Sequence, residues 1–259
     1  MLRALPPLLV GLLASGVLAA PPRVVVDPGH GGAQEGAVGQ QGLLEKRLAL
    51  SLAQRLKVAL ERRLGAHVSL TRTVDRELSL AERVRLANLA KPDVFVSLHA
   101  NSMPTRKLRN RAQGIETFFL SASASGLEAG ATADRENAES PHRGVPSSTD
   151  ILAFILADLK RAEAHGDSSR LAYAVHKRLV EGTRAVDKGV QQAPFYVLMG
   201  VEAPAILVEV GFISHPEEGR RLGEAPYQQA LADALAAGIE KFWADAEKRN
   251  GSAPTLSKN

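Results

Sequence analysis

A strand that stops at a glycine-rich turn and continues as a helix constrains the fold of this chain most. Residues 23–27 read RVVVD, an apolar, β-branched run, and the turn Pro-Gly-His-Gly-Gly follows directly. Residues 44–64 then place leucine at every fourth position from Leu48, the spacing of an amphipathic helix, and Gly65 fits as its C-cap. Strand, turn and helix in this order are the repeating unit of an α/β fold.

The same alternation continues along the chain. Further strands are predicted at residues 67–70, 93–98, 115–120, 195–198 and 205–210. Further helices are predicted at residues 78–89, 171–181 and 226–248. Apolar strands separated by helices predict a single α/β domain, a mainly parallel twisted sheet with helices on both faces.

Composition supports one folded domain and narrows its partners. The chain has 259 residues, of which 45% are hydrophobic, enough for one substantial core. Its net charge is +4, and the densest basic run, RKLRNR at residues 106–111, has no nucleic-acid recognition motif around it. We therefore expect no nucleic-acid partner. The chain has no cysteine, which excludes disulfides and thiolate ligands.

The two ends of the chain differ from its middle. Residues 1–20 place Arg3 before an apolar stretch and end in small residues, the pattern of a signal peptide. The stretch is too short to span a bilayer securely, so we expect export without a stable membrane span, to a periplasm or outside the cell. Residues 21–249 are the expected folded domain, and residues 250–259 a flexible tail.

A segment at residues 121–166 interrupts the α/β pattern. Its first part, to residue 150, is small, polar and turn-rich, with no lasting period. Residues 151–159 are apolar on most of a helical circumference, so this helix must be buried or docked. We interpret the segment as a helical insertion within the domain.

Four residues that can bind a metal or transfer protons fall at one predicted edge of the sheet. His30 and His99 directly follow strands, Glu209 lies within the strand at 205–210, and Glu45 begins the first helix. Carboxyl ends of parallel strands converge, and two histidines with one glutamate suit Zn²⁺. Simpler explanations exist for each residue alone: a turn histidine, a helix-dipole partner, a hydrogen-bonded core histidine.

Glu209 is the most informative of the four. A carboxylate inside the apolar strand AILVEV costs several kcal/mol unless it is paired or used in function. Beside a metal it can serve as the general base for water and then as the acid for a leaving amine.

These motifs resemble the zinc-dependent N-acetylmuramoyl-L-alanine amidases, the cell-wall hydrolases of amidase type 3. The resemblance rests on VVVDPGHGG with Glu45, VSLTRTVDRELSLAERVRLAN, DVFVSLHANS and FYVLMGVEAPAILVEVGFISHPEE. It implies that residues 21–249 are the catalytic domain. It implies further that one Zn²⁺ is bound by His30, Glu45 and His99, with Glu209 as the catalytic acid–base.

The implied substrate is peptidoglycan, cut at the amide between N-acetylmuramic acid and L-alanine during wall remodelling or daughter-cell separation. Asp27 and Asn101 border the site and are expected to orient ligands or substrate. Arg72 and Asp75 are expected to fix the loop instead. His215 stands where relatives more often have Asn, and we do not expect it to be a fifth ligand.

The insertion also resembles a segment of division-associated relatives that covers the active site until an activator protein binds. On that resemblance, an acid such as Glu136 or Glu139 lies near the metal. The activator would dock on the apolar face of the inserted helix, made of Ile151, Leu152, Ile155, Leu156 and Leu159. A passive helix that covers the sheet is the alternative.

Two other functions remain open at this point. A zinc peptidase of similar design would cut elsewhere in the stem peptide. A non-catalytic wall-binding protein would share the fold, although such proteins usually lose a ligand or the base, and all four residues are present here.

Overall fold

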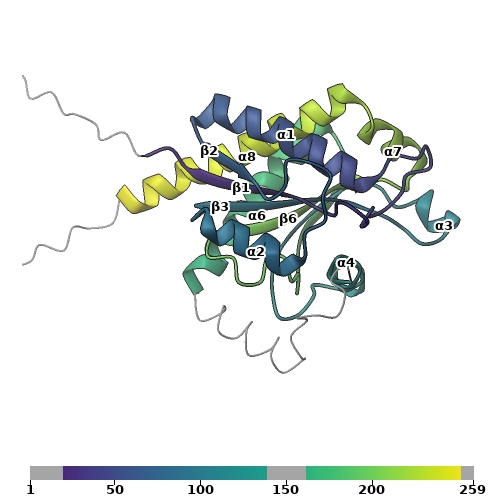
Figure 1. Ribbon diagram of the computed structural model, residues 1–259, viewed down its shortest axis with the longest axis horizontal. Coiled ribbons are helices and arrows are strands. Elements are labelled where there is room, and N and C mark those ends of the chain that lie inside the picture. The colour runs from purple at the N-terminus through teal and green to yellow at the C-terminus, as the bar shows by residue number, and fades with distance from the viewer. Residues whose placement is uncertain (1–19, 139–161, 252–259) are drawn as a thin grey trace, which may run out of the picture.

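A six-stranded sheet organises residues 20–138 and 162–251, which the computed structural model describes (Figure 1). Across the sheet the strand order is β2-β1-β3-β6-β4-β5. The strands are β1 (Arg23–Pro28), β2 (His67–Leu70), β3 (Val94–Asn101), β4 (Ile115–Leu120), β5 (Asp187–Ala193) and β6 (Ala205–Phe212). The described helices are α1 (Glu45–Leu64), α2 (Leu80–Leu89), α3 (Arg106–Arg109), α4 (Leu127–Asn137), α6 (Ala162–Thr183), α7 (Pro216–Leu222) and α8 (Ala225–Gly251).

Strand direction changes once across the sheet. Strands β2, β1, β3 and β6 are parallel, β4 is antiparallel to β6, and β5 is parallel to β4. The prediction of a mainly parallel α/β sheet is confirmed. The carboxyl ends of β1, β3 and β6 therefore lie at one edge, where β4 and β5 begin.

Helices cover both faces of the sheet, as predicted. On one face α1, α6 and α8 bury a continuous apolar layer over Val26, Val96 and Val208. On the other face α2, α4 and the loop after β5 cover a smaller cluster around Phe95 and Leu207. Figure 1 shows α1 and α8 on one side of the sheet and α2 and α4 on the other.

Local sequence explains where the helices begin and end. Gly65 adopts φ 61° and its N–H donates to the Glu61 carbonyl, so the predicted C-cap of α1 is confirmed. Helix α2 begins with a capping box in which Ser79 and Glu82 bond each other's backbone N–H groups. The predicted helices at residues 171–181 and 226–248 are present within the longer α6 and α8.

One strand prediction is wrong. Residues 195–198 form turns, with the Leu198 N–H donating to the Phe195 carbonyl at 3.1 Å. The sixth strand is β5, whose sequence DKGVQQA is too polar to suggest a strand. Among the described strands it pairs only with β4, at the margin of the sheet, where a strand does not need an apolar sequence. Phe195 is buried, but as part of a turn.

The segment 121–166 contains more helix at its ends than the sequence pattern indicates. Helix α4 forms within the small, polar stretch, and Ala129 and Ala133 on its inner face are buried in the smaller cluster. Helix α6 begins at Ala162. At the far end, α8 continues to Gly251, past the predicted start of the tail. No helix in the two described ranges combines the length and apolar character needed to cross a membrane.

Candidate metal centre

The turn after β1 has a backbone that only a few residues tolerate. His30 adopts φ 56°, an unusual value for a residue with a side chain, and Gly31 and Gly32 adopt φ 132° and 61°. At Gly29 there is no room for a side chain, since a Cβ would lie 2.4 Å from His99 Cε1. The turn therefore brings the His30 and His99 rings together, with ring centroids 4.8 Å apart.

Two buried arginines hold this turn through its carbonyl groups. Arg72 donates to the carbonyls of Pro28 and Gly29, at 3.0 and 2.6 Å. Arg83 donates to the carbonyls of Pro28 and His30, at 2.8 and 2.7 Å. The expectation that Arg72 fixes the loop therefore agrees with its contacts. These hydrogen bonds offset the cost of the unusual backbone conformation at His30.

Asp27, at the end of β1, helps to fix the same turn. Its carboxylate accepts hydrogen bonds from Arg83 at 3.0 Å, from Ser97 at 2.9 Å and from Thr71. Burial raises the pKa of Asp27, but the Arg83 charge and the Thr71 hydrogen bond outweigh it, so the pKa is lowered. Asp27 thus positions the His30 turn through Arg83.

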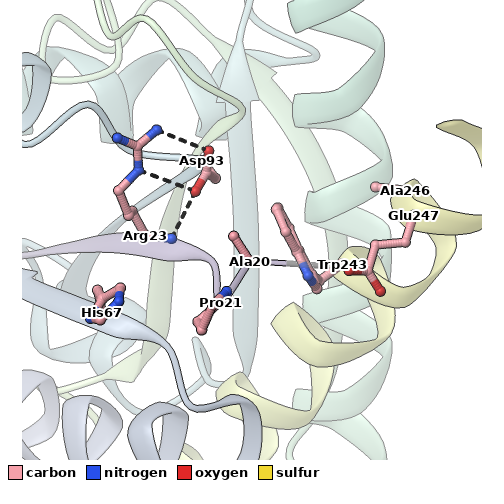
Figure 2. A pocket seen from close by; sticks show the side chains of 8 residues that line it. All are labelled: Ala20, Pro21, Arg23, His67, Asp93, Trp243, Ala246 and Glu247. Carbon is pink, nitrogen blue, oxygen red and sulfur yellow. Dashed lines mark hydrogen bonds and ion pairs between the residues drawn. The ribbon is translucent and has the colours of Figure 1, made fainter. Parts of the chain in front are cut away.

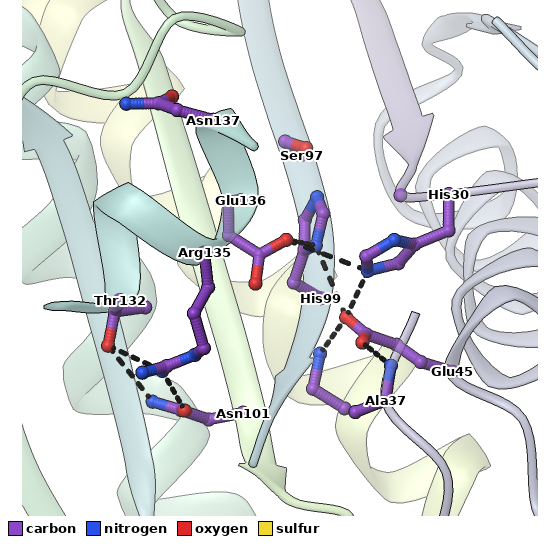
Figure 3. A network of polar contacts seen from close by, with 12 residues as sticks. His30, Ala37, Glu45, Ser97, His99, Asn101, Thr132, Arg135, Glu136 and Asn137 are labelled. Carbon is purple, nitrogen blue, oxygen red and sulfur yellow. Dashed lines mark hydrogen bonds and ion pairs between the residues drawn. The ribbon is translucent and has the colours of Figure 1, made fainter. Parts of the chain in front are cut away.

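Four donor side chains converge at the carboxyl edge of the sheet (Figure 3). They are His30, Glu45, His99 and Glu136, all buried, with ligand atoms within 4.8 Å of one another. Glu45 Oε1 lies 2.8 Å from His30 Nε2 and 3.2 Å from His99 Nδ1. Glu136 Oε2 lies 2.8 Å from His99 Nδ1 and 3.6 Å from His30 Nε2.

The arrangement of these atoms fits a metal ion. Within the described part of the chain, neither His99 Nδ1 nor Glu136 Oε2 makes a hydrogen bond of good geometry, although they lie 2.8 Å apart. Around a tetrahedral Zn²⁺ with bonds of ~2.0–2.2 Å, ligand atoms lie about 3.3–3.6 Å apart. The separations here, from 2.8 to 3.6 Å, are equal to or slightly shorter than this, so the four donor atoms converge closely enough to share one ion. The cluster could therefore hold a metal ion.

Glu45 is held for this position from two sides. Its Oε1 accepts from the Ala100 N–H and its Oε2 from the Ala37 N–H, each at 2.8 Å. Burial raises the pKa of Glu45, yet the neighbouring His30 and His99 lower it far more, so the carboxylate is ionised. A Cβ at Gly36 would lie 2.7 Å from Glu45 Oε2, so only glycine at this position lets the loop pass so close to the Glu45 carboxylate.

Glu209 lies beside the cluster on β6. It pairs with His99 across β3–β6 and with Glu116 across β4–β6, so all three point to the same face of the sheet. Glu209 is fully buried, and neither of its oxygens bonds any residue that the structure describes. Burial, and then the charge of Glu136, raise the pKa of Glu209 well above its ordinary range, against the opposing effect of His99.

Helix α4 closes the cluster with three consecutive residues (Figure 3). Arg135 donates to Asn101 Oδ1 at 2.6 Å, and Glu136 reaches the histidines. The Asn137 side chain donates to the Pro194 carbonyl at 2.8 Å and accepts from the Tyr196 N–H at 2.8 Å. A cleft of about 460 Å³ remains beside His30, Glu45 and Glu136.

The structure places His30, Glu45, His99 and Glu209 together at the carboxyl edge of the sheet, and Glu136, which the family resemblance put near the metal, supplies a further donor atom. Asn101 borders the centre and joins α4 to Glu116. Asp75 accepts from the Gly32 N–H and pairs with Lys46, so it also fixes the loop. His215 caps α7 by accepting from the Glu218 N–H. Glu139 and the five apolar residues of the predicted docking face lie outside the described residues: Ile151, Leu152, Ile155, Leu156 and Leu159.

Sequence reasoning missed two residues near the centre. Glu116 is buried on β4 directly opposite Glu209. The ammonium of Lys188, on β5, lies 3.6 Å from Glu116 Oε1. A buried acid in the apolar run IETFFL was a usable signal for Glu116. Lys188 had none, because the strand that carries it was not predicted.

A larger hollow of about 630 Å³ lies at the opposite edge, near the amino ends of the strands (Figure 2). Trp243 and Pro21 line it together with Arg23 and Asp93. The Asp93 carboxylate accepts from the Arg23 backbone N–H at 2.8 Å and also pairs with its guanidinium. Arg23 and Asp93 are thus bonded to each other, and the buried donor cluster at the carboxyl edge is the stronger candidate site.

Comparison with known proteins identifies the family. The family model described as N-acetylmuramoyl-L-alanine amidase matches residues 24–241. The chain belongs to the N-acetylmuramoyl-L-alanine amidase family. It is 35% identical over 231 residues to the amidase AmiA of Escherichia coli strain K12, covering 87% of this chain and 78% of AmiA. It is 35% identical over 224 residues to AmiC of E. coli strain CFT073, where it spans about half (53%) of the relative's length.

Solved structures of the family share the fold. The amidase AmiC2 of Nostoc punctiforme matches with a TM-score of 0.66 and 29% identity, covering 87% of this chain and 98% of that one. An amidase from Clostridium difficile 630 matches with a TM-score of 0.65 and 27% identity, covering 86% and 96%. The family that the sequence motifs resemble is therefore confirmed.

Proposed function

We propose that this chain hydrolyses the amide between N-acetylmuramic acid and L-alanine in peptidoglycan, with His30, Glu45 and His99 holding one Zn²⁺. The observation that carries the proposal is Glu209, a fully buried carboxylate without a bonding partner in the described chain, beside a His-Glu-His donor set. Such a carboxylate is costly to keep unless it takes part in the chemistry.

Each residue has a defined part in this reaction. When bound, the ion supplies Lewis-acid polarisation of the amide carbonyl and a lowered pKa for water. Glu209 takes the proton of the attacking water and delivers it to the L-alanine nitrogen as the C–N bond breaks. Asp27 and Arg83 hold the His30 turn, so the ligand is positioned before substrate arrives.

Product analysis tests the proposal. The purified chain, loaded with Zn²⁺, is incubated with defined muropeptides, and the new termini are identified by mass spectrometry. A free L-alanine amine with an intact sugar supports the amidase. A new terminus elsewhere in the stem peptide would identify a peptidase. Binding without any product, in the parent and in a variant that lacks the contacts of α4 with the cluster, would identify a wall-binding protein.

Metal content is the matching test for the centre. We expect about one Zn²⁺ per chain, and His99→Ala should lower the affinity strongly, since it leaves two of three predicted ligands. Glu209→Gln should keep the metal. Zinc that binds equally well to the His99→Ala variant would place the metal elsewhere.

We further propose that Glu136 blocks the centre in the described state. A catalytic zinc site keeps one position open, whereas four protein ligands make a closed site. Glu136 supplies the fourth donor atom, and Arg135 and Asn137 anchor it on both sides. In this proposal residues 121–166 form an autoinhibitory insertion, released when an activator protein docks on the inserted helix.

Export is part of the proposal as well. Cell-wall amidases act outside the cytoplasm, and the sequence of residues 1–20 has the pattern of a signal peptide. Expression with and without these residues, followed by cell fractionation, tests it. Equal export of both forms would contradict the assignment.

A further inference from the structure

Helix α4 presents charged side chains to the groups around the centre, beyond the contact made by Glu136. Glu128 Oε2 accepts from Lys188 Nζ at 3.1 Å, and Arg135 donates to Asn101 Oδ1 at 2.6 Å. Helix α4 thus pairs the Glu128 carboxylate with Lys188 on β5, and the Arg135 guanidinium with the Asn101 amide on β3.

Lys188 is held in a fixed place by the domain itself. Its ammonium lies 3.6 Å from Glu116 Oε1 and 5.3 Å from the centroid of the Phe212 ring. Only 22% of the Lys188 side chain is exposed, although lysine usually reaches fully into solvent. A lysine that is oriented by groups outside α4 keeps its position when α4 leaves.

The position of Lys188 relative to the centre is set by the sheet. His99, Glu209 and Glu116 form one row across β3, β6 and β4, and Lys188 follows on β5. Glu116 is already shared, because its Oε2 accepts from the Asn101 side chain at 2.7 Å. The ammonium has three donors, and the one that bonds Glu128 becomes available without α4.

We infer that Lys188 is a carboxylate-binding subsite for the stem peptide, and that Glu128 occupies the place of a substrate carboxylate. The inference rests on the proposed amidase function. A peptide leaving the centre along the row of β6, β4 and β5 meets Lys188 beyond the scissile amide. Its ligand is a peptide carrying a free carboxylate shortly after L-alanine, and Glu116 is a positioning residue that orients the ammonium.

The test compares two probes that differ in one charge. They are N-acetylmuramoyl-L-alanyl-D-glutamate and its D-isoglutamine amide, assayed with the full chain. Lys188→Met should reduce the ratio of kcat/KM for acid over amide by about tenfold, mainly through KM, because one charge-assisted bond is lost. Lys188→Arg should retain most of the preference, and Glu128→Gln should lower KM for the acid.

Controls separate this role from a structural one. Lys177→Met removes a lysine that is 73% exposed on α6 and should leave the ratio unchanged. Circular dichroism and melting temperature check that each variant folds. An unchanged ratio in Lys188→Met would overturn the inference, as would an equal rise with both probes, which would make Lys188 only an anchor for α4.

The inference can fail independently of the proposed function. If neither the parent nor the Glu136→Gln variant, in which the proposed block is removed, cleaves either probe, the amidase proposal fails. Calorimetric binding of L-alanyl-D-glutamate and its amide to the Glu128→Gln chain then still tests the subsite. Tighter binding of the acid that disappears when Lys188→Met is added supports it, and equal binding of both peptides overturns it.

Discussion

The two faces of strands β1, β3 and β6 are made from alternate residues of the same strands, yet they differ at the carboxyl edge. Under α1, α6 and α8 the face stays apolar to its end, at Leu98 and Val210. The other face begins as apolar, at Phe95, and becomes polar at His99 and Glu209. One face therefore provides stability along its whole length, and the other only along its first half.

Within the polar half, the buried carboxylates differ in whether they have hydrogen-bond partners. Asp27 has hydrogen bonds from Arg83, Ser97 and Thr71, so its burial is balanced by partners. Glu209 has none from the described residues. Uncompensated buried carboxylates cluster at functional sites, so the difference supports the proposed role of Glu209 as the reacting group and of Asp27 as a supporting one.

The largest expected effect comes from Glu209→Gln. We expect kcat to fall by about 10²–10⁴-fold, since a positioned general acid–base contributes on this scale. Stability should not fall, because the change removes an unpaired buried carboxylate. Steady-state kinetics and urea unfolding of the same sample measure both. Substantial residual turnover would assign the proton transfer to another group.

Arg83→Met tests the compensated part of the same face. Removing one partner of a buried ion pair should reduce the free energy of unfolding by ~3–5 kcal/mol. The variant also releases the carbonyls of Pro28 and His30, so metal affinity should fall with stability. Arg85→Met, on the exposed side of the same helix, is the matched control.

The Asp27–Arg83 pair also has a pH signature. Because the folded pKa of Asp27 lies below its ordinary value of 3.8, its contribution is complete above that pH. It is lost as pH falls through the lower folded pKa. Urea unfolding between neutral and acid pH should show a weaker acid-side loss in Arg83→Met than in the parent. Identical slopes would show that Asp27 does not depend on Arg83.

Ile206→Ala tests the apolar face on the strand that carries Glu209. Ile206 is fully buried in the larger cluster, so the change should cost ~2–5 kcal/mol of unfolding free energy. The kcat of the folded fraction should stay near the parent value, the reverse of Glu209→Gln. If both variants lose activity equally, the two faces are not separable.

Glu136→Gln should have the smallest effect and the opposite sign. If Glu136 blocks the centre, its replacement should raise kcat/KM about tenfold, equivalent to ~1.4 kcal/mol of contact. Glu128 makes no contact with the cluster in the described structure, so Glu128→Gln should raise activity less. A fall in activity with Glu136→Gln would make Glu136 part of the working centre.

Much of the fold follows from local sequence because its signals are local. The run RVVVD, the leucine spacing of α1 and Gly65 identify strand, helix and cap without any distant contact. The apolar run at residues 195–198 was misleading, because burial was achieved there in turns. Strand β5 escaped prediction because β4 supplies its pairing, which no property of DKGVQQA announces.

The sequence by itself determined the residue types of the centre. His30 follows one strand, His99 ends another, and Glu209 interrupts an apolar run, and these patterns can be read from the chain alone. Tertiary structure decided the rest: the part of Arg83 in holding the turn, the contacts by which Glu136 reaches both histidines, and the placement of Lys188 beside Glu116. Periodicity reports which way a side chain faces, whereas the meeting of β4, β5 and α4 with β6 depends on packing between distant segments.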